Sequence, residues 1–510
     1  MFALLGAAGV EAERLMAADP LASGSAPRLL ITAALLFPAA VPVLAALLRA
    51  GERRAALRRE DGERPFCARR AFLLILLCYA PMFVIAFPGT FAYDVPFQLK
   101  QVFTGAYSTH HPLLHTLLLG GCVALGRLLG SVNLGAALYT ALQATGLAGC
   151  FALTCASIAR QSGARPARRA AAFFALYPLH MVFAVNATKD VLFSGLFALT
   201  LALLGEAARA ERLTCREAAR LCACAGTMLL LRNNAAYAVL AWILLAAIPA
   251  LRHRRGAAVG AMALSLALAL GANGLLARAT NAQAGDVSEM LSWPIQQLAR
   301  ARLTRGDALD DGERAAIEEL MPGEAWRLYD PTISDPVKFE VDTRPLLQDP
   351  ARFARAYLSV GAKCPQTYFD AVLLHTAPFL CPYGRYRVSG YYVQMTVGEA
   401  YYDDWCDFER IHSAFPGVLS AISWRFGAQG AMQFPAIGWL FNMGLIVWAM
   451  LYFAVREAYE GRWRRLGVAL LPVLLWGTFL LGPVMAGRYI YPFVCALPVL
   501  ASRERGCGSV

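Results

Sequence analysis

Long apolar runs alternate with short basic links along most of the chain. Most of these runs hold about 18 to 25 residues, the length that an α-helix needs to cross the hydrocarbon core of a bilayer. They are rich in Leu and Ala, which favour helices, and lipid forces the backbone to satisfy its own hydrogen bonds. The pattern predicts an all-α polytopic membrane protein with about eleven transmembrane helices. The predicted spans are residues 29–48, 71–88, 133–157, 170–187, 191–205, 216–231, 235–251, 257–278, 431–454, 466–486 and 488–502.

Arginines gather in the links between the runs. The basic links are residues 49–70, 160–169, 206–220, 252–255, 456–465 and 503–505. Short loops rich in Lys and Arg stay in the cytoplasm, so we expect these links on the cytoplasmic side of the cell membrane. The remaining links then face outward. They are residues 89–112, 186–190, 231–234, 279–430 and 487–492.

One apolar run does not fit this alternation. If residues 113–130 crossed the membrane, the basic loop 160–169 would move to the outside. The run is interrupted by His115 and by the pair Gly120–Gly121, which is typical of a re-entrant or interfacial helix. We therefore predict that this helix enters and leaves on the outer side.

A long polar segment divides the chain into three parts. Residues 1–278 form an N-terminal transmembrane module with catalytic outer loops, and residues 431–510 form the C-terminal transmembrane helices. Between them, residues 279–430 have a helical period broken by prolines, which predicts an external helical cap in the periplasm or outside the cell. The cap holds three cysteines that permit one disulfide, although the sequence does not choose the pair. They are Cys364, Cys381 and Cys406.

Composition and charge agree with this topology. Of the 510 residues, 58% are hydrophobic and only 16% are charged, which is far from an ordinary soluble domain. A net charge of +12 can indicate nucleic-acid binding. Here the arginines lie between apolar spans, so the charge reports membrane topology and the expected surroundings are membrane lipids, not nucleic acid. The chain also lacks a P-loop and a G-x-G-x-x-G motif, so neither ATP nor a nucleotide sugar is the expected fuel.

Two carboxylates stand out on the predicted outer face. Asp94 follows a span in the motif F-A-Y-D-V-P, and Asp190 follows Lys189 in the link N-A-T-K-D. A carboxylate at the edge of the hydrocarbon is costly unless it is paired or functional. Each has a structural alternative, since aspartate also caps helices and favours their first turn. We predict that Asp94 and Asp190 are catalytic.

Basic and polar residues gather at the same face and are candidates for substrate binding. They are His110, His111, Lys189, Arg232, Asn233, Arg488 and Tyr489. The planar fork of a guanidinium suits a phosphate, although an isolated arginine at this depth also reaches toward lipid headgroups. In the cap, Gln296, Gln297 and Arg300 are suited equally to substrate contact and to helix support.

No metal site is predicted among these residues. His110, His111 and His115 lie close together in the chain, but the catalytic glutamate of an H-E-x-x-H motif is absent. A divalent cation therefore stays open as a cofactor, without a ligand set to hold it. The histidines are better suited to hydrogen bonding with a phosphate or a sugar hydroxyl.

The order Y-D-V-P, H-H-P-L-L and T-K-D in a multi-pass chain with an external segment resembles the GT-C fold of membrane glycosyltransferases. It is similar in particular to the superfamily of protein O-mannosyltransferases and aminoarabinose transferases. With L-R-N-N and G-R-Y it also resembles poorly characterised bacterial members of this fold. The likeness is best over residues 71–210. The chain departs from the pattern by a single Asp where the family has an acidic pair, and by the extra span 29–48.

The resemblance implies a GT-C-like bundle and a polyprenyl-phosphate sugar donor. The acceptor would be a cell-envelope glycan, lipid or protein, on the outer side of the membrane. Asp94 would act as general base, and Lys189, Arg232 and Arg488 would stabilise the phosphate leaving group.

Two other classes of function stay open. A transporter or lipid flippase would place its polar residues near the bilayer midplane, in broken helices of two inverted repeats. Here the charges lie at helix ends on one face, and no internal repeat is found. A polymer ligase or polymerase with a lipid diphosphate donor would use arginines in the same way and would differ mainly in its substrate.

Overall fold

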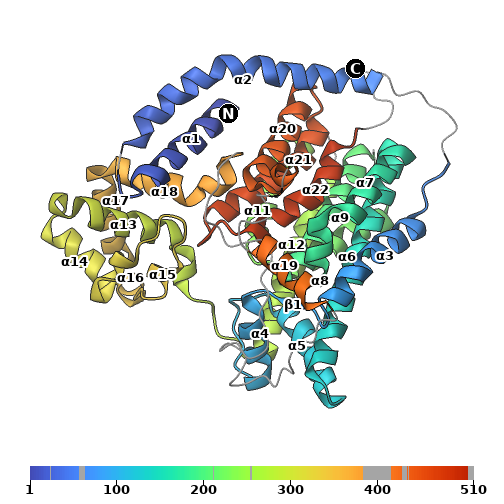
Figure 1. The fold of residues 1–510 in the computed structure, drawn as a ribbon, viewed down its shortest axis with the longest axis horizontal. Coiled ribbons are helices and arrows are strands. Elements are labelled where there is room, and N and C mark those ends of the chain that lie inside the picture. The colour runs from blue at the N-terminus through green and yellow to red at the C-terminus, as the bar shows by residue number, and fades with distance from the viewer. Residues whose placement is uncertain are drawn as a thin grey trace.

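The computed structural model describes residues 1–503 apart from residues 23, 57–63, 211, 253–255, 383–414, 428–433 and 435. In this part of the chain the regular structure is helical apart from one pair of two-residue strands (Figure 1). The all-α class is confirmed, and its apolar helices indicate a membrane protein. Six of the described helices are long and apolar enough to cross a membrane, namely α2 (Ser25–Ala56), α3 (Ala68–Ile85), α6 (Val132–Ser162), α9 (Lys189–Arg209), α12 (Ala257–Ala279) and α21 (Trp463–Leu480).

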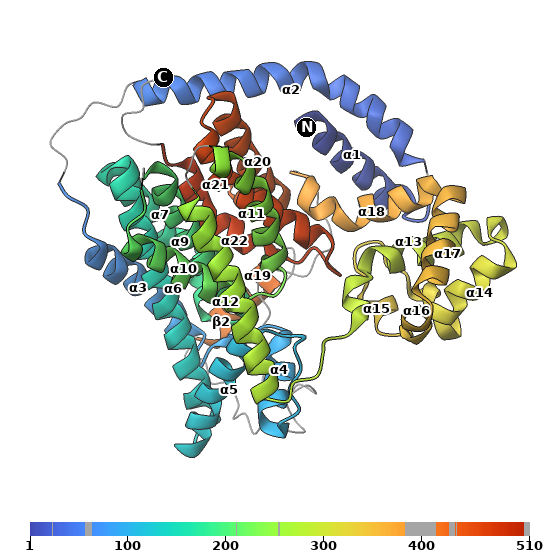
Figure 2. The ribbon, with the colours of Figure 1, turned by 180° about the vertical axis from the view of Figure 1, so that it is seen from behind.

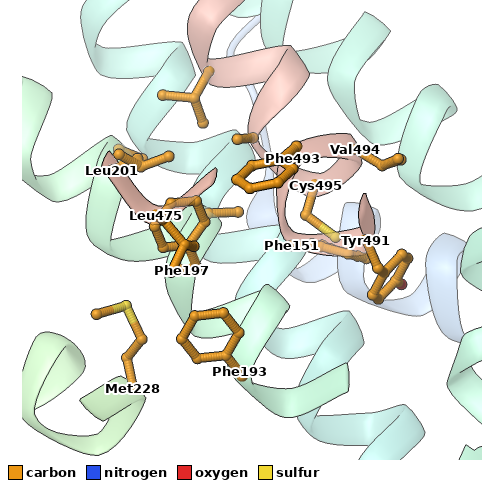
Figure 3. Close-up of a cluster of buried hydrophobic side chains, with 14 of the residues drawn as sticks. Phe151, Phe193, Phe197, Leu201, Met228, Leu475, Tyr491, Phe493, Val494 and Cys495 are labelled. Atoms are coloured by element: carbon orange, nitrogen blue, oxygen red, sulfur yellow. The ribbon is translucent and has the colours of Figure 1, made fainter. Parts of the chain in front are cut away.

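The centre of the bundle is α9. It packs against α6 and α21, and also against α10 (Cys215–Leu230) and α22 (Tyr491–Ala501). Side chains from all of these helices share one hydrophobic core (Figure 3). Gly195 lets α9 approach α6 closely, because a Cβ at this position would lie only 3.0 Å from Leu147 Cδ1. Close packing along α9 therefore fixes its first turn, which carries Lys189 and Asp190.

Two predicted spans differ from the helices that form there. Residues 170–187 are divided into α7 (Ala164–Leu176) and α8 (Pro178–Val185), because Pro178 cannot continue α7 and forces Tyr177 into an extended conformation. In residues 431–454 the long helix is α20, and it begins only at Met443, where the Asn442 side chain caps it by accepting from Leu445 N at 2.8 Å. The remaining elements of the bundle are α11 (Ala235–Arg252), α19 (Pro416–Gly427), η5 (Gly438–Phe441), α20 (Met443–Tyr459) and η6 (Gly487–Ile490).

Two shorter helices lie at one end of the bundle, as both views show (Figures 1 and 2). They are α4 (Asp94–Thr104) and α5 (Leu113–Leu128). A turn at Gly130, with φ of 88°, leads from α5 into α6. Gly126 and Gly135 let the two helices pack backbone against backbone, because a Cβ on either glycine would collide with the other helix. With 16 residues α5 is about 24 Å long, shorter than the hydrocarbon core.

A second helical unit lies beside the bundle (Figure 1). It has its own hydrophobic core, which includes Ile295, Trp326 and Tyr368. Cys364 is a free thiol in this core, and Cys406 falls outside the described residues. The elements of the unit are η1 (Val287–Met290), α13 (Ser292–Arg305), η2 (Gly306–Ala308), α14 (Asp311–Leu320), η3 (Pro322–Leu328), α15 (Asp335–Lys338), α16 (Arg344–Gln348), α17 (Pro350–Lys363) and α18 (Pro365–Leu380).

The N-terminal residues form a helix that the apolar pattern did not indicate. This helix, α1 (Phe2–Ala18), packs against α2 and α18. The link from α1 to α2 is held by the buried Arg300, whose guanidinium donates to Pro20 O at 2.6 Å and to Ala22 O at 2.7 Å. Arg300 of α13 therefore ties the link between α1 and α2 to the helical unit. It has a structural role.

Candidate active site

A short parallel strand pair brings two distant loops together. Strand β1 (Thr90–Phe91) follows α3, and β2 (Asn186–Ala187) precedes α9; Thr90 lies opposite Asn186 in the pair. Gln143 of α6 supports β2, because its Nε2 donates to Asn186 O at 3.0 Å. Asp94 comes shortly after β1, and Lys189 follows β2 after the single residue Thr188. The strand pair therefore brings Asp94 and Lys189 to the same end of the two strands. The sequence did not indicate this strand pair, because a strand of two residues shows no alternation of apolar and polar positions.

Asp94 is bound by two cations. Its Oδ2 lies 2.8 Å from Lys189 Nζ, and its Oδ1 accepts from Arg488 Nη2 at 3.2 Å. The three side chains are 13 to 19% exposed, so the group is largely enclosed but can be reached. Asp94 is not the N-cap of α4, but it lies in the first turn of this helix, where its charge favours the helix dipole. The helix begins at Asp94 itself and Tyr93 takes the N-cap position without a side-chain cap bond.

The second carboxylate, Asp190, is completely buried. It forms an ion pair with Arg232, and its Oδ2 lies 3.6 Å from Arg488 Nε. Arg488 therefore lies between the two carboxylates. Asp190 is also in the first turn of α9, where its charge favours the helix dipole.

Arg232 is enclosed by aromatic rings. Its guanidinium carbon lies 4.4 Å from the ring centroid of Phe479 and 4.8 Å from that of Tyr489. A cation packed on ring faces in a dry environment is stabilised by the ring quadrupoles. Asn234 orients it further, since its Oδ1 accepts from Arg232 Nε at 3.0 Å. The sequence argument missed Asn234, although it follows Arg232 and Asn233 directly.

The paired histidines join the cluster through Lys189. Lys189 Nζ lies 3.2 Å from His111 Nδ1, and the rings of His110 and His111 meet edge to face with centroids 4.4 Å apart. Burial lowers the pKa of both histidines, and the adjacent charge of Lys189 lowers the pKa of His111 further. Both rings are therefore neutral at pH 7, and His111 Nδ1 accepts a hydrogen bond from the Lys189 ammonium.

Other candidates lie outside this cluster. Asn233 Nδ2 donates to Thr109 O at 3.1 Å and so fixes the histidine loop. His115 is a core residue, bonded to Gln98 and Tyr139. In the helical unit, Gln296 donates to Asp330 O at 2.7 Å, and Gln297 bonds to Tyr357 and Tyr368. Among the described residues, no three His, Cys, Asp or Glu side chains converge as metal ligands would.

The ionisation of Asp94 is set by its neighbours. Burial raises the pKa of this carboxyl, but the charges of Arg488 and Lys189 outweigh burial and hold the pKa well below its usual value. Asp94 is therefore a carboxylate at neutral pH. The stabilisation from its ion pairs is present above the usual aspartate pKa of about 3.9, and it is lost as the pH falls through the lower, folded-state pKa.

We predict that Lys189→Met shifts this acid loss of stability to higher pH. The variant removes one of the two cations that lower the pKa of Asp94, so the carboxylate takes up a proton earlier. Thermal unfolding of the purified protein between about pH 1 and pH 6 measures the effect. Lys100→Met is the control, because it removes an exposed lysine of α4, and it should leave the pH dependence of the parent unchanged. If the parent and the Lys189 variant show the same pH dependence of the melting temperature, Lys189 does not lower the pKa of Asp94.

Comparison with known proteins finds one family model that matches most of the chain. A model described as "Family of unknown function (DUF6020)" matches residues 102–503. The matched region contains Lys189, Asp190, Arg232 and Arg488, whereas Asp94 precedes it. No curated protein and no solved structure matches the chain.

Proposed function

The chain belongs to this family of unknown function, and we propose that it is a membrane glycosyltransferase of the GT-C type. In this proposal it transfers a sugar from a polyprenyl-phosphate carrier to a hydroxyl of a cell-envelope glycan, lipid or protein. The reaction takes place at the outer face of the cell membrane.

The observation that carries the proposal is the charge of the cluster. With both histidines neutral, the cluster consists of two carboxylates and three cations, so these five side chains carry one excess positive charge. A polyprenyl-phosphate sugar is a phosphodiester with one negative charge, and its binding makes the site neutral.

Lys189 and Arg488 are the cations placed to meet the phosphate. Both are partly exposed and both hold Asp94, whereas Arg232 is enclosed and paired with Asp190. When the phosphate takes over the N–H donors of Lys189 and Arg488, Asp94 loses the partners that lower its pKa. The carboxylate then becomes a stronger base at the moment when the donor is in place.

These positions support the following transfer. The oxygen of the acceptor hydroxyl bonds to the anomeric carbon of the sugar and its proton passes to Asp94. The bond between that carbon and the phosphate oxygen breaks, and polyprenyl phosphate leaves. Lys189 and Arg488 stabilise the charge that grows on the phosphate. Asp190 and Arg232 do not meet the phosphate in this proposal. Asp190, which is paired with Arg232, holds the Arg488 guanidinium in place.

The proposal includes a membrane topology. It has about eleven crossings, with α5 as a re-entrant or interfacial helix and residues 279–430 as an external cap. Loops 49–70, 160–169 and 252–255 then lie in the cytoplasm.

We predict that residues of the helical unit are accessible from outside intact cells. A cysteine at Arg344, whose side chain is 82% exposed, should react with a membrane-impermeant maleimide before lysis. A cysteine at Arg165, in the basic loop 160–169, should react only after lysis. Labelling above that of the parent protein is the measurement. The opposite labelling order would overturn the topology and the outward orientation of the site.

The phosphate site can be tested without knowledge of the sugar or the acceptor. Polyprenyl phosphate is expected to raise the melting temperature of the purified protein, with stabilisation near 2.7 kcal/mol at about one hundred times Kd. Polyprenol of the same chain length is the control, since it lacks only the phosphate. Equal stabilisation by the two lipids would show that the charged cluster binds no phosphate.

A further inference from the structure

The link from α12 to the helical unit passes along the loop that carries the paired histidines. Gln283 N donates to Tyr107 O at 2.9 Å, and Thr109 N donates back to Gln283 O at 2.8 Å. Gly285 continues this contact, because a Cβ there would lie 3.3 Å from His110 Cα. The helical unit is thus connected directly to the histidine loop.

Glu289 lies where this link enters the unit. Its Oε1 is 2.8 Å from Lys338 Nζ and 4.0 Å from His110 Nδ1. Lys338 is only 6% exposed and also pairs with Asp335 Oδ1 at 2.7 Å. A buried lysine held by two carboxylates is a fixed anchor, so Glu289 is held beside His110 from the helical unit.

From His110 the contacts continue to the base. The His110 ring packs against His111, which accepts from Lys189, and Lys189 holds Asp94. The proposed transfer uses Lys189 and Asp94 but gives no part to Glu289 or Lys338. The ammonium of a lysine sits on a flexible four-carbon chain, and fixing it costs about 2 kcal/mol of conformational entropy. Contacts that orient Lys189 in advance therefore improve its binding of an anion.

We propose that Glu289 and Lys338 are positioning residues for the phosphate site, acting through His110 and His111 on Lys189. The inference rests on the proposed function for the identity of the ligand. The helical unit then contributes to phosphate binding, because Lys338 of α15 helps to orient the Lys189 side chain that binds the phosphate.

The test measures binding of polyprenyl phosphate to the full-length purified protein. Glu289→Gln and Lys338→Met are each expected to weaken binding about tenfold, in the range of coupling between residues in one network. Lys363→Met is the matched control, since Lys363 also pairs with two carboxylates of the helical unit but lies on α17, outside this chain of contacts. It should bind like the parent.

A double-mutant cycle separates positioning from loss of fold. Once Lys189→Met has removed the positioned group, Glu289→Gln should cause no further loss of binding, whereas a general structural defect would add to it. Parent-like binding by both Glu289→Gln and Lys338→Met, or fully additive losses, would overturn the positioning role and leave the proposed function standing. Failure of the parent protein to bind polyprenyl phosphate would instead overturn the proposed function, and this inference with it.

Discussion

Asp94→Asn is expected to abolish sugar transfer while the protein still folds. Asparagine keeps the size and the hydrogen-bonding capacity of the side chain but cannot accept the proton of the acceptor hydroxyl. Loss of a general base should lower the rate at least a hundredfold. The rate of donor consumption by the reconstituted protein is the measurement. A cooperative unfolding transition shows that the variant is folded, at a melting temperature lowered by the loss of the Asp94 ion pairs.

Asp342→Asn is a suitable control for this experiment. Asp342 also pairs with an arginine, Arg344, but on the surface of the helical unit. It should leave the rate unchanged. If Asp94→Asn is as active as the parent while Asp190→Asn is inactive, the base has been assigned to the wrong carboxylate. Full activity of both variants would contradict the mechanism.

Arg488→Ala is expected to cause the largest loss of donor binding. Arg488 bridges Asp94 and Asp190, and its fork is placed to meet the phosphate. Loss of a charged contact in a desolvated site should cost on the order of 2 to 5 kcal/mol of binding free energy. Arg488→Lys should restore only part of it, since lysine keeps the charge without the planar fork. Titration with polyprenyl phosphate measures both variants.

Arg425→Ala is the control for Arg488. Its guanidinium also packs on aromatic rings, those of Trp424 and Phe434. It should bind the donor like the parent. Equal binding by the Lys and Arg forms at position 488 would instead show that the positive charge alone is needed and that the planar fork is not.

The helices of the bundle were predictable because lipid leaves the backbone few alternatives. Long runs of Leu and Ala therefore located α3, α6, α9 and α12. The break between α7 and α8 was missed, although Pro178 marks it. The helix α1 was missed because its buried face is made of small residues such as Ala7 and Gly9, which pack closely but give no strong apolar period.

The candidate site was predictable in part, for the same reason. Charged residues at span ends stand out in an apolar chain, so Asp94, Asp190 and Arg488 could be assigned to one face. Their partners could not be, since each ion pair joins residues that lie far apart in sequence.

The helical unit was the least predictable region. Gln296 and Arg300 were suited equally to substrate contact and to helix support, and the packing of the unit shows the supporting role. Glu289 and Lys338 were not singled out, because nothing in the sequence marks their pairing. In a polar segment no lipid boundary separates buried from exposed positions. The sequence pattern therefore predicts the helices but not which neighbour each side chain contacts.

Phosphorus NMR of the donor tests the central claim most directly. The reconstituted protein would be incubated with polyprenyl-phosphate mannose or glucose and a cell-envelope extract that supplies the acceptor. With a donor that the site accepts, the phosphodiester signal should decrease and the phosphomonoester signal of polyprenyl phosphate should increase, with no such change for Asp94→Asn. An unchanged phosphodiester with either donor, together with consumption of a polyprenyl-diphosphate sugar or movement of the lipid across the bilayer, would contradict the account.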